Sequence, residues 1–290
     1  MRLAFLGTPE ASVPSLRALV AAGHHVEVVL TRPDRRRGRG SELSPSPVKV
    51  AALELGLPVA HRLSDLDAVE VERGIVVAFG VMIPADLLAR IPMLNVHFSL
   101  LPRWRGAAPV ERAILAGDVE TGVCVMTLEP ELDTGPVHLV RQLSVGDKDA
   151  RTLTMELAVL GADALVKVLS SDELLTHPTL QSGDATYAAK LTKETFHLTP
   201  DMSHTEVLRT VRLGRAFTFV RDGRVGIESA TAAGETVSPG SVVLRDRTVL
   251  LGTSDGAVRL DAVRPSGART MSAESWWDGA RFTDEPVQWT

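Results

Sequence analysis

A chain of 290 residues, 44% of them hydrophobic, can form one large globular domain or two ordinary ones. Its net charge of −5 argues against a uniformly basic protein that coats nucleic acid, although it leaves room for a local basic patch. The single cysteine allows no intramolecular disulfide, and we find neither a signal peptide nor an apolar span long enough for a membrane. We therefore expect a cytoplasmic protein without membrane contact, and a monomer.

The N-terminal residues predict a strand–helix–strand unit. An apolar run over residues 2–6 ends at Gly7, helical spacing follows over residues 12–22, and a second apolar run covers residues 26–30. This order predicts an α/β domain with a parallel sheet and a right-handed crossover. Thr8-Pro9 stands where a dinucleotide-binding turn would need more glycines, so we predict no nucleotide cofactor.

A long polar loop is predicted over residues 31–47. It holds five arginines within eight positions: Arg32, Arg35, Arg36, Arg37 and Arg39. A loop of this length is either functional or a solvated segment. The planar guanidinium suits phosphate groups, so a phosphate clamp is the functional alternative, and composition alone leaves both open.

The secondary-structure pattern of the rest of the chain changes near residue 195, which suggests two parts. Helical or strand-like patterns follow one another over residues 48–55, 75–78, 93–98, 111–115, 121–126, 137–144 and 152–169. Residues 170–194 lack a clear period and are typical of a connector. Beyond Phe196 one helix is predicted over residues 203–213, and short apolar runs then alternate with the hairpin signals Asp222-Gly223 and Asp255-Gly256. We expect a small barrel or sandwich there.

One polar pair stands out in the predicted strand 93–98. Asn95 and His97 are two residues apart, so they share a strand face at its carboxyl end, where α/β enzymes build their sites. Asp133 follows in a turn-like sequence. An amide, an imidazole and a carboxylate together can polarise a carbonyl and move a proton. On spacing alone, a structural strand pair and an ordinary turn aspartate remain the alternative.

Longer stretches point to a family. NVHFSLLPRWRGAAPVERAI, followed by LDTG, resembles the signature of the folate-dependent formyltransferases. MRLAFLGTPEASVPSL, RPDRRRGRGSELSPSPVK, ATYAAKLTKE and MSAESWWDGARF resemble the same family, in its order. The likeness runs from Met1 to about Phe282, which is most of the chain.

The resemblance implies a Rossmann-like formyltransferase domain with a parallel sheet and an OB-like β-barrel domain. On this basis we expect a catalytic domain over residues 1–177, a linker over residues 178–195 and a tRNA-binding domain over residues 196–290. It also implies transfer of a formyl group from 10-formyltetrahydrofolate to the α-amino group of methionyl initiator tRNA, for translation initiation.

The resemblance assigns roles to individual residues. Asn95, His97 and Asp133 would be catalytic, with Asn95 donating to the oxyanion and Asp133 supporting His97. The family's folate-binding loop maps onto Ser99, Leu100, Leu101 and Pro102. Its basic loop contacts the acceptor end of the tRNA, which favours tRNA binding by Arg32, Arg35, Arg36, Arg37 and Arg39. No metal is required, and the histidines lack zinc-ligand spacing.

Three rival functions remain open. The chain could formylate an amino-sugar nucleotide or another small amine, or it could hydrolyse 10-formyltetrahydrofolate with water as the acceptor. A non-catalytic RNA-binding protein on the same fold is the third, and the intact trio argues against it. Phe98 replaces the small residue that is usual in the family, and we expect its bulk to reshape the wall of the folate pocket.

Overall fold

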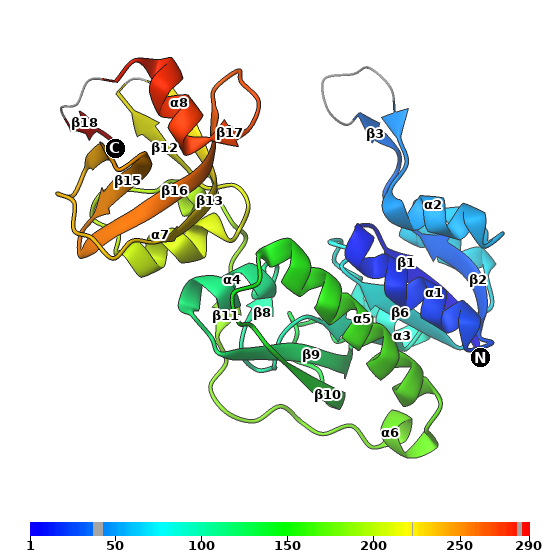
Figure 1. The fold of residues 1–290 in the computed structure, drawn as a ribbon. Helices are drawn as coiled ribbons and strands as arrows, with labels where there is room; N and C mark the ends of the chain where they lie inside the picture. Colours follow the sequence, from blue (N-terminus) through cyan, green and yellow to red (C-terminus); the bar gives the residue numbers. More distant parts are fainter. Residues whose placement is uncertain (37–42, 222, 283–285) are drawn as a thin grey trace. The chain divides into compact units, whose positions relative to one another are not determined.

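The computed structural model describes residues 1–36, 43–221, 223–282 and 286–290 (Figure 1). Arg37, Arg39 and Asp222, which the sequence singled out, lie outside these ranges. Contacts divide the chain into two units. The first comprises Met1–Val110, Val119–Gly146 and Leu153–Ala189, and the second comprises Glu111–Asp118, Asp147–Thr152 and Lys190–Thr290.

A seven-stranded sheet forms the centre of the first unit, in the order β10-β9-β7-β6-β1-β2-β5. Its strands are β1 (Arg2–Gly7), β2 (His25–Leu30), β5 (Val59–Ala60), β6 (Arg73–Val77), β7 (Met93–His97), β9 (Glu120–Thr127) and β10 (Val137–Ser144). Five neighbouring strands, in the order β7-β6-β1-β2-β5, pair in parallel, as the sequence predicted. The sheet as a whole is mixed, because β9 is antiparallel to both β7 and β10. The short connection between β9 and β10 permits the antiparallel β9–β10 pair, whereas a parallel pair needs a longer crossover.

Helices cover this sheet or connect its strands. They are α1 (Val13–Ala21), α2 (Pro47–Glu54), α3 (Ala85–Arg90), α4 (Pro109–Ala116), α5 (Ala150–Leu169) and α6 (Asp172–Thr176), with 3-10 turns η1 (Glu10–Ser12) and η2 (Leu63–Ala68). Ser46 caps α2, since its hydroxyl accepts a 3.0 Å hydrogen bond from the Lys49 N–H. Gly161 lets α5 approach the sheet, because a Cβ there would lie 2.6 Å from Val96 Cγ1.

Two short ladders lie outside the main sheet. β3 (Arg35–Arg36) and β4 (Leu43–Ser44) pair antiparallel within the predicted arginine loop. β8 (Arg105–Gly106) pairs in parallel with β11 (Tyr187–Ala188). The second ladder brings part of the predicted connector against the segment that follows β7.

The second unit contains the predicted barrel. Its ring of strands comprises β12 (Phe217–Val220), β13 (Gly223–Ala232), β16 (Gly256–Pro265), β15 (Thr248–Thr253), β14 (Ser241–Arg245) and β18 (Val287–Gln288), with β17 (Met271–Ser272) on β16. A bridge between Val220 and Trp289 nearly closes the ring. The short helices of this unit include η3 (Glu194–Phe196), α7 (His204–Val211) and α8 (Ala273–Ala280), and most of α4 belongs to the same unit. Trp276 and Trp277 bury α8 against the barrel core.

Candidate active site

The polar pair of the sequence lies at the carboxyl end of β7. This strand sits inside the sheet, between β6 and β9, so both of its residues are buried: Asn95 is 9% exposed and His97 is 6% exposed. Strand alternation places them on one face. Val96 and Phe98 lie on the other face, near Gly161 of α5. Phe98 therefore fills the helix–sheet interface and not the side of Asn95 and His97, where we expected it to alter a pocket wall.

The side-chain amide of Asn95 has its hydrogen-bonding capacity unused by protein. Within the described ranges no hydrogen bond reaches this amide, and it is not among the groups sealed from solvent. A buried amide without a protein partner is costly unless a ligand or water satisfies it. Asn95 is thus a donor that a substrate oxygen can reach.

The backbone of Trp104 orients His97. Nε2 of His97 lies 2.9 Å from the Trp104 carbonyl oxygen, and a carbonyl accepts only, so Nε2 carries a proton. Nδ1 of His97 then faces Oδ2 of Asp133 at 3.7 Å, which is an ion-pair distance but too long for a hydrogen bond. In the neutral ring Nδ1 is free to accept a proton, and in the charged ring it faces a carboxylate.

Asp133 occupies a tight turn between β9 and β10. Its φ of +52° is unusual for a residue with a side chain. Its Oδ2 accepts a 2.7 Å hydrogen bond from the Gly106 N–H. Gly135 is required two residues later, because a Cβ there would lie 2.0 Å from the Thr127 carbonyl oxygen. The close packing at Gly135 and the hydrogen bond from Gly106 hold this unusual conformation and so keep the carboxylate beside His97.

The predicted folate loop, residues 99–102, is held in place by contacts of its first two residues. Ser99 is fully buried and its hydroxyl donates to the Arg103 carbonyl at 2.6 Å, so it braces the loop. Leu100 lies over Gly122 of β9, where a Cβ would come within 2.5 Å of Leu100 Cδ2. Leu101 and Pro102 are partly exposed and joined by a cis peptide bond. Cys124 lies beneath them, and burial raises the pKa of its thiol to about 11, as expected of a core residue.

Two residues near this site were missed by the sequence analysis. Thr186 Oγ1 accepts a 2.9 Å hydrogen bond from the Trp104 N–H. The Gln181 amide donates to the carbonyl of Asp133 at 2.8 Å. Both belong to the segment that was predicted as a connector or linker, and no local signal in the sequence marks their contacts.

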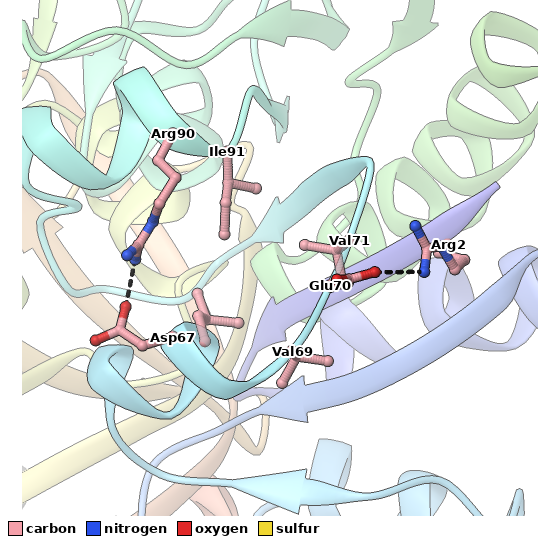
Figure 2. Close-up of a pocket in the computed structure, with 8 residues that line it drawn as sticks. Arg2, Asp67, Val69, Glu70, Val71, Arg90 and Ile91 are labelled. Carbon is pink, nitrogen blue, oxygen red and sulfur yellow. Dashed lines mark hydrogen bonds and ion pairs between the residues drawn. The ribbon is translucent and has the colours of Figure 1, made fainter.

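A cavity of about 330 Å³ lies at the end of the sheet opposite to the candidate active site (Figure 2). It opens at the amino ends of β1, β6 and β7, between apolar residues such as Val69 and Val71. Its two arginines are paired, Arg2 with Glu70 at 3.2 Å and Arg90 with Asp67. Since Asn95 and His97 lie toward the carboxyl ends, this cavity is separate from the candidate active site.

Comparison with known proteins decides the family. The Formyl transferase family model matches residues 1–169, and the model of the Formyl transferase C-terminal domain matches residues 190–281. The chain belongs to the formyl transferase family. This confirms the resemblance drawn from the motifs.

The relatives of this formyl transferase match it along its whole length. The methionyl-tRNA formyltransferase of Roseobacter denitrificans is 40% identical over 300 residues, covering 98% of this chain and 97% of that protein. The enzyme of that name from Jannaschia sp. is 42% identical over 307 residues, covering 99% of each. HypX from Aquifex aeolicus, solved with tetrahydrofolic acid, shares the fold, with a TM-score of 0.63 at 19% identity. It matches 96% of this chain, which spans about half of HypX (47%).

The three arginines that the structure describes in the arginine loop of this formyl transferase have different surroundings. Arg32 is half-buried, and its Nη2 donates to the Gly80 carbonyl at 2.8 Å, so it braces two loops. Arg35 and Arg36 are exposed on β3, and within the described part of the chain neither has an ion-pair partner. Asp34 does not offset them, because both of its oxygens bind Lys49 Nζ at 2.8 Å.

A cationic and aromatic cluster lies on the barrel of this formyl transferase. The guanidinium of Arg224 sits 4.1 Å from the ring centre of Phe217, and Lys193 Nζ lies 5.7 Å from the same ring. His197 stacks on Phe217 at 5.0 Å, with 8° between the rings. Lys193 and Arg224 are exposed. Arg212 of the same unit instead donates to the Lys148 carbonyl.

The described residues contain neither a candidate membrane span nor a candidate cluster of metal ligands. None of the helices there is long and apolar enough to cross a membrane. In the same ranges, no three His, Cys, Asp or Glu side chains gather as metal ligands.

Proposed function

We propose that the chain transfers the formyl group of 10-formyltetrahydrofolate to the α-amino group of methionyl initiator tRNA. The product is N-formylmethionyl-tRNA for translation initiation, made in the cytoplasm by a monomeric enzyme. The observation that carries the proposal is the end-to-end likeness to enzymes of this name, over both the sheet domain and the barrel domain. The unpaired Asn95 amide beside His97 and Asp133 supports the chemistry.

The first chemical step prepares the amine. An α-ammonium group cannot attack, so a proton must leave its nitrogen. His97 Nδ1 and the Asp133 carboxylate face each other at 3.7 Å, so a nitrogen placed beside the pair, about 2.8 Å from each, can contact both. In our proposal one of these two groups takes the proton, and the other stabilises the resulting charge.

The attack forms a carbon–nitrogen bond and turns the formyl oxygen into an oxyanion. The Asn95 amide donates a hydrogen bond to that oxygen, and it gains strength as negative charge develops. His97 adds a second donor when Nδ1 is protonated. The intermediate then collapses: the bond from the formyl carbon to N10 of the folate breaks, N10 takes a proton, and the new amide nitrogen loses its second proton.

The loop Ser99–Pro102 is proposed to hold the folate. Its braced backbone and the partly exposed Leu101 and Pro102 offer polar and apolar contact to a flat heterocycle. Val81 and Met82, 44% and 66% exposed, lie in the segment that follows β6 and offer further apolar contact. No nucleotide or metal is part of the proposed transfer.

The domain roles follow the same proposal. Residues 1–177 carry the catalytic domain, residues 178–195 connect it, and residues 196–290 bind the tRNA. The exposed cations Lys193 and Arg224, which lie against the buried ring of Phe217 beside the partly exposed His197, support this role, since exposed cations bind nucleic acid through its phosphates.

Changing Lys193 and Arg224 together to Ala should weaken tRNA binding and flatten its log–log salt dependence by roughly 1–2 units, at 0.7–0.9 per lost phosphate contact. The affinity for the folate donor should stay the same. Arg245→Ala with Arg259→Ala is the matched control, because these two barrel arginines are already paired, with Glu235 and Asp261. Equal slopes for the wild type and K193A/R224A would contradict a tRNA role for this cluster.

An acceptor panel tests the proposed function. The purified chain is given 10-formyltetrahydrofolate with methionyl initiator tRNA, with an amino-sugar nucleotide, or with water alone. We expect rapid transfer only to the tRNA. Faster transfer to the amino sugar, or donor hydrolysis at the same rate without tRNA, would overturn the acceptor assignment and favour one of the rival functions.

A further inference from the structure

A strap over residues 181–188 crosses the candidate active site within the first unit. Its β11 pairs with β8, and the carbonyl of Ala188 accepts from the Ala107 N–H at 2.9 Å. Gly106 is needed at this crossing, because a Cβ there would lie 3.0 Å from that carbonyl oxygen. The strap therefore lies against the loop that carries the Gly106 N–H, the donor to Asp133.

Gln181 at the start of the strap uses both ends of its side-chain amide. Its nitrogen donates to the carbonyls of Asp133 at 2.8 Å and Gly135 at 2.9 Å. Its oxygen accepts from Nη2 of Arg105 at 2.7 Å and from Nε at 3.1 Å. One side chain thus ties the turn that carries the carboxylate to the residue next to Gly106.

The hydrogen bonds of Gln181 stabilise two features of the site: the conformation of the Asp133 turn, and the hydrogen bond between Asp133 and Gly106. The Asp133 turn is strained, with φ +52°, and such a conformation persists only when surrounding contacts hold it. The hydrogen bond between Gly106 and Asp133 joins two segments that are 27 residues apart in the sequence. Fixing Arg105 and Asp133 to a single amide keeps the donor and the acceptor of that bond in register.

We propose that Gln181 is a positioning residue for formyl transfer, which holds the Asp133 carboxylate in register with His97 and the Gly106 N–H. The inference rests on the proposed function of Asp133. Gln181 acts through the Asp133 turn and has no chemical role of its own. Its loss should therefore affect the rate of the bound complex more than the binding of either substrate.

Two variants of Gln181 distinguish the hydrogen bonds made by its amide nitrogen from those made by its amide oxygen. Gln181→Met removes all four hydrogen bonds, whereas Gln181→Glu keeps an acceptor for Arg105 but loses the donor to Asp133 and Gly135. Both should lower kcat roughly 10- to 100-fold, the cost of misplacing a catalytic group by about 1 Å or less. The KM values for folate and tRNA should stay within about twofold, as expected when only transition-state interactions are lost. Gln142→Met on the exposed face of β10 is the matched control and should match the wild type.

A double-mutant cycle with Asp133→Asn decides the assignment. Once the carboxylate is gone, adding Gln181→Met should lower kcat little further, because coupled residues are non-additive. If Asp133→Asn alone keeps wild-type kcat, the proposed catalytic role of Asp133 fails. If Asp133→Asn is impaired but the Gln181 variants keep full kcat, or if Gln181→Met costs the same factor in both backgrounds, the positioning role is overturned. Should Gln181→Met fail to fold, Gln181→Glu carries the same expectation.

Discussion

Replacing Asn95 by Ala should lower the turnover of formyl transfer about 10²–10³-fold, the usual loss for one oxyanion donor. The physical reason is that the Asn95 amide, which no protein group engages in the described structure, is the donor free to meet the developing charge. Donor and tRNA binding should change much less, because the charge exists only in the transition state. The measurement is kcat at saturating concentrations of both substrates.

A second variant controls for shape. Asn95→Asp keeps the size of the side chain but replaces the amide donor by an acceptor, so it should be at least as inactive as Asn95→Ala. Asn95 is the only asparagine in the sequence. Labelling asparagine alone with ¹⁵N thus gives one side-chain amide signal, which should shift when a folate analogue binds. Near-wild-type turnover in Asn95→Ala would show that the trio is wrongly assigned.

Changing Arg35, Arg36 and Arg37 together to Ala should weaken tRNA binding and flatten the log–log salt slope by up to roughly 2–3 units. Each arginine that contacts a phosphate releases counterions on binding, and this release is lost with the side chain. Arg35 and Arg36 are exposed without ion-pair partners in the described chain, so they are free for such contacts. Folate affinity should not change, since the folate loop is built from other residues.

The matched control also removes three arginines, but from another part of the first unit. Arg2, Arg17 and Arg90 are exposed arginines of the first unit that already pair with Glu70, Glu54 and Asp67. Changing these three to Ala should leave the salt slope close to that of the wild type. Parallel salt lines for the wild type and the Arg35, Arg36 and Arg37 triple variant would mean that the loop is a solvated face.

Local pattern was enough to predict the centre of the fold. The alternation around Asn95 and His97 predicted that they share a face of a buried strand, and β7 places them so. The same reasoning predicted the parallel strands and a small barrel or sandwich in the C-terminal part of the chain, and the structure forms a nearly closed barrel there. These features depend on side-chain period and on neighbours in the sequence, which a single chain displays directly.

Contacts between distant segments could not be read in this way. Gln181 meets Arg105 across 76 positions, and Arg32 meets Gly80 across 48. The pairing of Asp34 with Lys49, across 15 positions, is another contact that the sequence does not display. The tautomer of His97 depends on where the Trp104 carbonyl points, and Trp104 has a φ of +61° that its sequence neighbours did not predict.

A single-turnover experiment tests the central claim most directly. Excess enzyme is mixed with donor labelled in its formyl carbon and with methionyl initiator tRNA, and the label is followed with time. We expect the label to appear on the methionine amine at the chemical rate in the wild type, and about 10²–10³-fold more slowly in Asn95→Ala. Label that stays on the folate in the wild type, or that moves equally fast in Asn95→Ala, would contradict the account.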